Sequence, residues 1–210
     1  GERNQKSKGF VLIVIACLWM WGGCDGVSRE NDAAYETAKV LKEGYETGIE
    51  ETTEGSVQDR EKNCFEKTFG SYELPKDWIE SEEHSTAERF FYVKTGDEKK
   101  DRPDNISVHE GENPYAQSEH EAFREAILRQ LSAQISGDED VTLYGEGYTA
   151  EGGSTVYRFT IEESETGIVT TMYYIVGDYR YVLIHETNFT GDPSADEAAR
   201  QVADTFRWDV

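Results

Sequence analysis

The residues with the clearest chemistry in this 210-residue chain are Cys24 and the two glycines that precede it. A lipoprotein signal peptidase requires small residues directly before the cysteine whose thiol receives diacylglycerol, and Gly22 and Gly23 satisfy that requirement. Trp21 departs from the pattern, because an aliphatic residue is usual three positions before the cysteine. We therefore predict that Cys24 is lipidated, by diacylglycerol and a fatty-acyl chain such as palmitate.

The segment before Cys24 has the organisation of a signal peptide. Arg3, Lys6 and Lys8 precede an uninterrupted apolar run over residues 10–21. A membrane-spanning helix needs roughly 20 apolar residues, so this run is short for a permanent anchor. The pattern predicts a lipoprotein signal peptide over residues 1–23 and an extracytoplasmic protein held by lipid at a bacterial cell membrane. Two alternatives stay open, an ordinary secretory signal and an uncleaved short anchor.

The remaining cysteines carry no predicted chemistry. Cys17 lies inside the predicted signal peptide, and Cys64 has no second cysteine at Cys-x-x-Cys spacing. A mature domain with one free thiol forms no intramolecular disulfide, so its stability must come from an apolar core.

Patterns typical of enzymes are missing from the sequence. The four histidines, His84, His109, His120 and His185, are scattered and lack the i, i+4 spacing of helical zinc ligands. No Gly-x-Ser-x-Gly segment is present to expose a nucleophilic serine. We therefore predict no catalytic residues, no metal ligands and no cofactor, and a protein that is not an enzyme.

Two groups of aspartates keep a cation-binding alternative open. Asp97, Asp101 and Asp104 lie in one charged segment, and Asp138 and Asp140 lie in another. Carboxylates suit hard cations, but neither group has the ligand order or the glycine of a calcium loop. A small-ligand or divalent-cation-binding lipoprotein is therefore our second functional hypothesis, and an enzyme of unrecognised type is the third.

Net charge restricts the partners. The chain carries 21 basic and 43 acidic residues, and removal of residues 1–23 leaves 18 basic and 42 acidic residues, a net charge of −24. Nucleic-acid binding is disfavoured, because phosphate recognition needs a basic face. The acidic surface favours solubility and self-repulsion, and it is compatible with cations or a basic partner.

The chain divides at about residue 62. Residues 24–62 are rich in Glu, Thr, Gly and Asp, and they read as an acidic flexible tether. Apolar residues within it are spaced loosely as in a helix over about 31–47, so a short helix there is an alternative. Residues 63–210 are rich in aromatic and β-branched residues and have the size of one domain, predicted to be monomeric.

The elements of that domain are mostly strands. Alternating apolar residues and turn signals predict strands over 65–74, 88–95, 105–109, 141–148, 155–162, 168–176 and 179–188. The pair Gly177 and Asp178 is expected to form a two-residue hairpin turn. Because the later strands are apolar on both sides, the antiparallel sheet must be covered on both faces.

Two helices are expected to provide that cover. Residues 119–136 place Phe123, Ile127, Leu131 and Ile135 at every fourth position, after a Ser118–Glu121 capping box. Residues 193–206 carry a stripe of small apolar residues. The predicted fold class is α+β, an α/β/α sandwich around a mostly antiparallel sheet of about six to seven strands.

A family resemblance agrees with this order of elements. Residues 72–78 read Tyr-Glu-Leu-Pro-Lys-Asp-Trp. They are followed by an aromatic hairpin, by Asn-Ile-Ser-Val at 105–108, and then by a long helix, a meander and a short helix. Over about residues 65–209 the chain resembles the PsbP-like fold family, which includes the PsbP subunit of photosystem II and bacterial DcrB-like lipoproteins. The resemblance implies a binding or assembly module rather than an enzyme. It carries over no functional residues and no photosynthetic role.

We therefore expect a membrane-anchored, non-catalytic lipoprotein that binds a protein partner in an envelope or membrane assembly. The identity of that partner cannot be read from the sequence.

Overall fold

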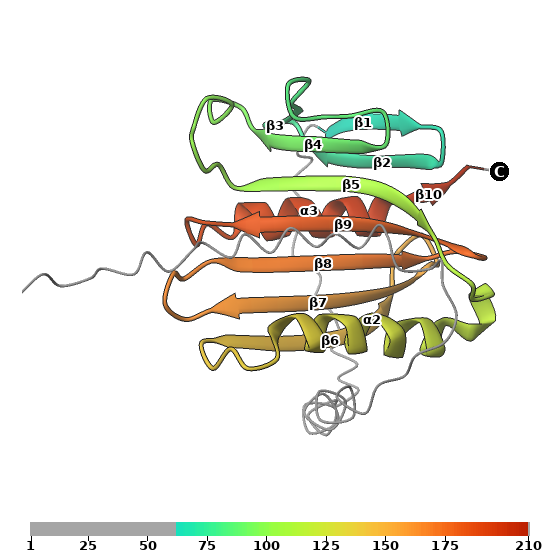
Figure 1. The fold of residues 1–210 in the computed structure, drawn as a ribbon. Helices are drawn as coiled ribbons and strands as arrows, with labels where there is room; N and C mark the ends of the chain where they lie inside the picture. The colour runs from blue at the N-terminus through green and yellow to red at the C-terminus, as the bar shows by residue number, and fades with distance from the viewer. Residues whose placement is uncertain (1–61, 210) are drawn as a thin grey trace, which may run out of the picture.

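The computed structural model describes residues 62–209, which form two sheets and two α-helices (Figure 1). Every neighbouring pair in the main, seven-stranded sheet is antiparallel. From one edge to the other its strands are β3 (Trp78–Glu80), β4 (Arg89–Lys94), β5 (Asn105–Glu112), β9 (Arg180–Asn188), β8 (Val169–Val176), β7 (Thr155–Glu163) and β6 (Val141–Thr149). The predicted α+β class and seven-stranded antiparallel sheet are confirmed.

Alternation along the central strands separates two apolar cores. In β8, Met172 and Tyr174 face one side of the sheet, whereas Tyr173 and Ile175 face the other. All four side chains are fully buried. Successive strand residues point to opposite faces, so strands that are apolar throughout require a covering layer on each face.

Helix α2 (His120–Ile135) covers the face of Met172 and Tyr174. Its predicted stripe is confirmed, because Phe123, Ile127 and Leu131 are buried and Ile135 packs against the same core. The expected Ser118–Glu121 capping box is wrong. The chain enters the helix one turn earlier through a 3-10 turn, η1 (Gln117–Glu119), where the Glu119 carboxylate accepts the N–H of Ala116 over 2.9 Å.

Helix α3 (Ser194–Thr205) covers the opposite face, as predicted. Ala195, Ala198, Ala199 and Val202 are fully buried, and their small side chains let the helix approach the sheet closely. This completes the expected α/β/α sandwich.

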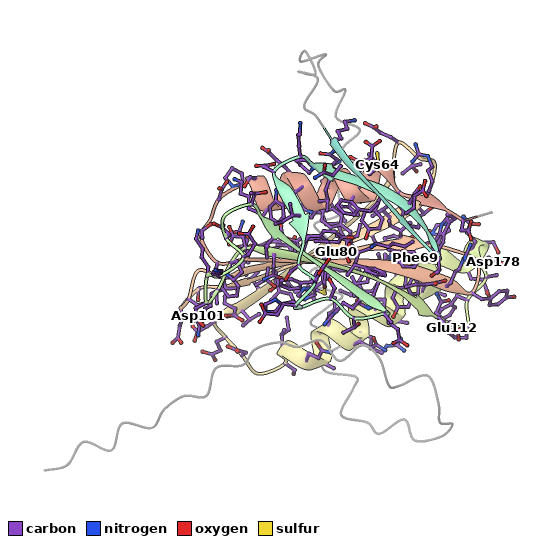
Figure 2. The ribbon with its side chains drawn as sticks, turned by 90° about the horizontal axis from the view of Figure 1, so that it is seen from above. Cys64, Phe69, Glu80, Asp101, Glu112 and Asp178 are labelled. Atoms are coloured by element: carbon purple, nitrogen blue, oxygen red, sulfur yellow. The ribbon has the colours of Figure 1, made fainter. Side chains whose placement is uncertain are left out.

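A separate three-stranded sheet, which we did not predict, packs into the core beneath α3. It consists of β1 (Lys62–Lys67), β2 (Gly70–Pro75) and β10 (Arg207–Trp208). The single strand predicted over 65–74 is therefore wrong, because the chain reverses between residues 67 and 70. Gly70 permits the close approach of β10 to β2, since a Cβ there would meet the carbonyl oxygen of Arg207 at 2.3 Å. Figure 2 shows this hairpin from above, marked by Cys64 and Phe69.

The hairpin between β8 and β9 differs by one residue from the prediction. The N–H of Gly177 donates to the carbonyl of Arg180 over 2.8 Å, so the two central residues are Asp178 and Tyr179. Tyr179 takes the left-handed conformation, with φ of 58°. The turn is held from outside, because Tyr179 donates its N–H to Tyr115 and accepts from the N–H of Asn113.

Several predictions lie outside the described residues. Cys24, the signal peptide over 1–23 and the acidic tether up to residue 61 belong to this group, and the domain boundary at residue 63 stays a prediction. Between residues 62 and 209, no helix combines the length and hydropathy that crossing a membrane would require.

Candidate binding pocket

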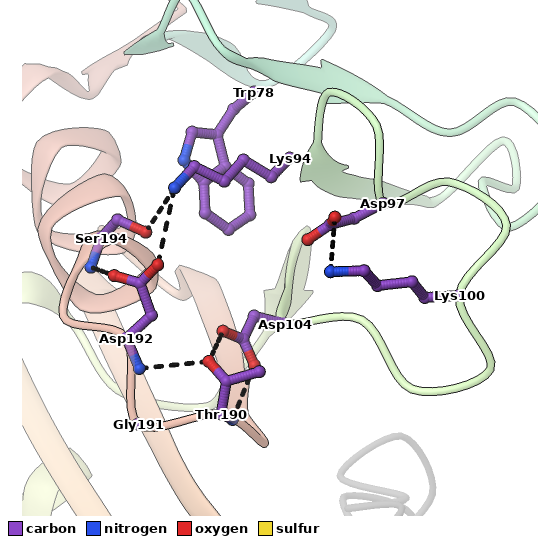
Figure 3. A pocket seen from close by; sticks show the side chains of 9 residues that line it. All are labelled: Trp78, Lys94, Asp97, Lys100, Asp104, Thr190, Gly191, Asp192 and Ser194. Atoms are coloured by element: carbon purple, nitrogen blue, oxygen red, sulfur yellow. Dashed lines mark hydrogen bonds and ion pairs between the residues drawn. The ribbon is translucent and has the colours of Figure 1, made fainter.

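A pocket of about 410 Å³ opens beside the first turn of α3 (Figure 3). Its walls combine strand residues, a charged loop and the segment that leads into α3. They are Trp78, Lys94, Asp97, Lys100, Asp104, Thr190, Gly191, Asp192 and Ser194. Figure 2 marks the charged loop by Asp101, at the end of the molecule opposite Glu112 and Asp178. The volume falls within the roughly 300–1,000 Å³ of pockets that bind small molecules.

Asp104 builds one wall of the pocket. Its Oδ1 accepts the N–H groups of Phe189 at 2.7 Å and Thr190 at 3.2 Å, and its Oδ2 accepts the Thr190 hydroxyl. The residue is buried. Both carboxylate oxygens of Asp104 therefore accept hydrogen bonds from the loop after β9, and these bonds fix the position of that loop.

Asp192 builds the wall beside α3. Its Oδ1 accepts the N–H of Ser194 over 2.9 Å, which satisfies one of the free N–H groups at the start of the helix. The hydrogen bonds from Ser194 and the nearby Lys94 ammonium hold the pKa of Asp192 below its usual value. Asp192 thus stays ionised and fixes the position of Ser194.

Trp78 and Lys94 reach the pocket together, because they are directly opposed residues of β3 and β4. Lys94 Nζ donates to the Ser194 hydroxyl over 3.1 Å and lies 3.6 Å from Asp192. Trp78 is 1% exposed and contributes to the pocket wall. Figure 3 shows the indole nitrogen turned toward the Lys94 amine.

The lining supplies several hydrogen-bond donors beside its three carboxylates. They include the indole of Trp78 and the ammonium groups of Lys94 and Lys100, although Lys100 is paired with Asp97 at 2.7 Å. No serine, cysteine or threonine of the lining lies beside a histidine, because no histidine lines the pocket. A donor-lined wall suits a ligand with acceptor oxygens.

A partly buried polar network lies under α3, and sequence analysis did not detect it. Arg158 of β7 contacts both oxygens of Asp196, at 3.1 and 3.3 Å, and also binds Glu146 at 3.2 Å. Tyr173 donates its hydroxyl to Asp196. The sequence signal was a charged residue beside apolar neighbours in each of two strands, Arg158 in β7 and Glu186 in β9.

Glu186 is the most unusual member of this region. It is 1% exposed, it follows Val182 and Ile184 on the α3 face of β9, and its Oε2 has no hydrogen-bond partner among the described residues. Burial, and then the charge of Asp196, raises the pKa of Glu186 to about 8 despite the opposing effect of Arg158. The carboxyl is therefore protonated at neutral pH.

The histidines are closer together than the sequence suggested. His109 in β5 pairs with Leu183, and His185 in β9 pairs with Ser107, so the two rings lie diagonally on one sheet face. Burial and the Arg89 cation lower the pKa of each to about 4. The other two are remote, since His84 bonds Ser81 in a loop and His120 bonds Tyr157 at the start of α2.

The other residues considered in the sequence, Asp138, Asp140 and Cys64, lie away from the pocket lining. Asp138 accepts the N–H of Asp140 in a turn, and Cys64 is an exposed thiol on β1, 3.8 Å from a carboxylate oxygen of Glu73. Within residues 62–209 no three His, Cys, Asp or Glu side chains gather as metal ligands do.

Comparison with known proteins gives matches only among solved structures. No family model and no curated protein matches the chain. One similar structure is cyanobacterial PsbP (CyanoP) from Synechocystis sp. PCC 6803, at 14% identity and a TM-score of 0.43, covering 76% of this chain and 99% of that one. Another comes from Bacteroides thetaiotaomicron, at 13% identity and a TM-score of 0.43, covering 73% of this chain and half of the other.

Proposed function

We propose that this chain is an extracytoplasmic lipoprotein, anchored through Cys24, that binds a protein partner of the cell envelope and performs no catalysis. The observation that carries the binding role is the pocket beside α3, in which Trp78, Lys94 and Ser194 converge on one wall. A ligand with acceptor oxygens would gain hydrogen bonds from the donors of this wall.

The rigidity of the walls supports this role. Asp104 and Asp192 fix the loop on one side, and the β3–β4 pairing fixes Trp78 and Lys94 on the other. Preorganised walls lose little conformational entropy when a partner binds. The pocket would receive a single acceptor-bearing side chain or chain terminus of the partner.

Site-specific photo-crosslinking in native membranes tests the partner. A photoreactive residue at Lys100, on the pocket rim, should give a discrete adduct with one envelope protein. The same residue at Glu162, an exposed position on β7, is the matched control. Adduct formation at Lys100 that is lost in the Lys94→Ala variant would support binding through the pocket. Equal adducts at both positions, or none at Lys100, would contradict it.

The membrane anchor is tested separately. Replacement of Cys24 by Ser should release the protein from the membrane fraction while leaving the far-UV circular dichroism and cooperative unfolding unchanged. A Cys24→Ser variant that stays bound as tightly as the parent would favour an uncleaved anchor.

A small-ligand protein is the second candidate, favoured by the pocket volume of about 410 Å³. The divalent-cation version of this hypothesis has less support, because both oxygens of Asp104 are engaged by the chain itself. Thermal unfolding with calcium, manganese or zinc separates these ideas, since a ligand at 100 times its dissociation constant adds about 2.7 kcal/mol.

A further inference from the structure

Strand β6 is the long free edge of the main sheet. It spans nine residues and pairs only with β7 within the part of the chain that the structure describes. An edge strand presents unpaired N–H and C=O groups, which can pair with another strand.

The hydrogen bonds at both ends of the β6–β7 hairpin show which groups are free. The N–H of Ala150 donates to Ser154 at one end, and the N–H of Ser164 donates to Asp140 at the other. In an antiparallel pair, every second residue of a strand forms its backbone hydrogen bonds with the neighbouring strand. Even-numbered residues of β6 therefore bond to β7, and the N–H and C=O groups of the odd-numbered residues point outward. Gly147 is one of the outward residues and is exposed, and in glycine that exposure belongs to the backbone itself.

Other edges of the two sheets have features that limit pairing, and β6 lacks them. β3 has three residues and β10 has two, while β1 carries Lys62 and Lys67. β6 contains no lysine and no proline, and its single charged residue, Glu146, binds Arg158 within the same sheet. Edge strands that avoid association are normally short, charged or interrupted by proline.

We propose that β6 is a self-association edge, which pairs antiparallel with β6 of a second copy about a two-fold axis at Gly145. This register overlaps the whole strand and joins outward residues only, with Val141 opposite Thr149 and Leu143 opposite Gly147. Two-fold symmetry makes the same edge serve both copies. The two seven-stranded sheets then form one continuous sheet.

The side chains of β6 fit this register. Tyr144, one of two large exposed apolar side chains among residues 62–209, lies opposite Glu146 of the second copy. The two Glu146 carboxylates do not face each other, whereas a register centred on Glu146 would oppose them. Cross-strand pairs of like charge destabilise a sheet, so the charge pattern selects the axis at Gly145. The chain's net charge of −22 opposes association, and added salt should therefore strengthen the dimer.

Charge variants at Tyr144 test the register. Sedimentation of the full chain in non-ionic detergent should show a concentration-dependent dimer. Tyr144→Glu places like charges together at two symmetric positions and should raise the dissociation constant by about 2- to 30-fold. Tyr144→Lys places opposite charges there and should leave that constant unchanged or lower it.

Tyr179 provides the matched control, because it is the other exposed tyrosine and lies in the turn between β8 and β9. Tyr179→Glu and Tyr179→Lys change the net charge by the same amounts as the corresponding Tyr144 variants. The dissociation constants of these two control variants should differ by no more than a factor of about two. A parent that stays monomeric, or identical effects at Tyr144 and Tyr179, would overturn the proposal.

Hydrogen exchange provides a test without substitution. As the protein concentration rises, the amides of residues 143, 145, 147 and 149 should exchange more slowly, while those of residues 142, 144, 146 and 148 stay unchanged. Protection of the odd-numbered amides that does not depend on concentration would mean that the chain's own residues cover this edge, and would also overturn the proposal.

Discussion

Tyr173 in β8 donates its hydroxyl to Oδ1 of Asp196 in the first turn of α3, over 2.8 Å. Arg158 of β7 binds the same carboxylate from the side. Two strands of the main sheet therefore fix the first turn of α3 through one aspartate, next to the turn where Lys94 meets Ser194. The position of the pocket wall depends on this attachment.

Replacement of Tyr173 by Phe should lower the free energy of unfolding by about 1.5–3 kcal/mol, because a buried hydroxyl loses its hydrogen bond to a charged, partly exposed carboxylate. Urea denaturation measures this change. Tyr144→Phe is the control, since Tyr144 is 52% exposed and the substitution should cost no more than about 0.5 kcal/mol. Equal stability of the two variants would mean that Asp196 is held by Arg158 alone.

Stability should decline as the pH rises from about 4.5 to 8 because of Glu186. Its pKa is about 8 in the folded protein against 4.5 as the reference value, so between these pH values the folded protein holds one more proton than the unfolded chain. The contribution of Glu186 to stability is complete below about pH 4.5 and falls by about 1.4 kcal/mol per pH unit up to about pH 8. Glu186→Gln keeps a neutral side chain and should remove this slope. Parallel parent and variant profiles between pH 5 and 8 would contradict the assignment.

The buried histidines should act in the opposite direction. The pKa of His109 is about 4 in the folded protein against a reference value of 6.5, so its contribution is present above about pH 6.5 and is lost as the pH falls toward 4. The pKa of His185 is lowered in the same way, so the unfolded chain also binds a proton at His185 that the folded protein does not bind over this pH range. His109→Leu should reduce the acid-side slope by about 1.4 kcal/mol per pH unit relative to the parent. Chemical denaturation between pH 4.5 and 6.5 measures it, and an unchanged slope would show that His109 becomes protonated without unfolding.

The contact of α2 with the sheet is tested at Leu131, which is 1% exposed. Leu131→Ala should cost about 2–5 kcal/mol through lost apolar burial and the cavity left behind. Gln134→Ala, at an exposed position of the same helix, should stay within about 0.5 kcal/mol. Denaturation midpoints that are equal for both variants would mean that α2 does not contribute to the core.

The two layers of helix and the main sheet could be predicted from the sequence because their signals are local and repeated. The four-residue spacing of Phe123, Ile127 and Leu131 identifies α2. Alternating apolar residues identify β7, and a continuous run of aromatic and aliphatic residues identifies β9. The sequence predictions of turns were wrong where a single residue decides the geometry of the turn. At residues 177–180, for example, the hydrogen bond from Gly177 to Arg180 moves the turn by one residue.

The pocket could not be predicted, because its walls come from distant parts of the chain. Lys94 meets Ser194 only after β4 is paired in the sheet and α3 lies across it, and the two residues are 100 positions apart. Glu186 was equally hidden, since an isolated glutamate in a strand gives no sign of whether its face of the sheet is covered. Both depend on tertiary packing rather than on local spacing.

The pairing of β10 with β2 joins the last described residues to the first hairpin. Ser71 pairs with Arg207, and Thr205 accepts the N–H of Glu73 across 132 positions. Closing so long a loop is slow, and contacts of this kind form late in folding. During synthesis the outer edge of β2 must therefore stay unpaired until nearly the whole chain has emerged. A chain that stops before Phe206 would lack β10 and keep that edge open, and we expect such truncated products to be degraded or to aggregate rather than accumulate.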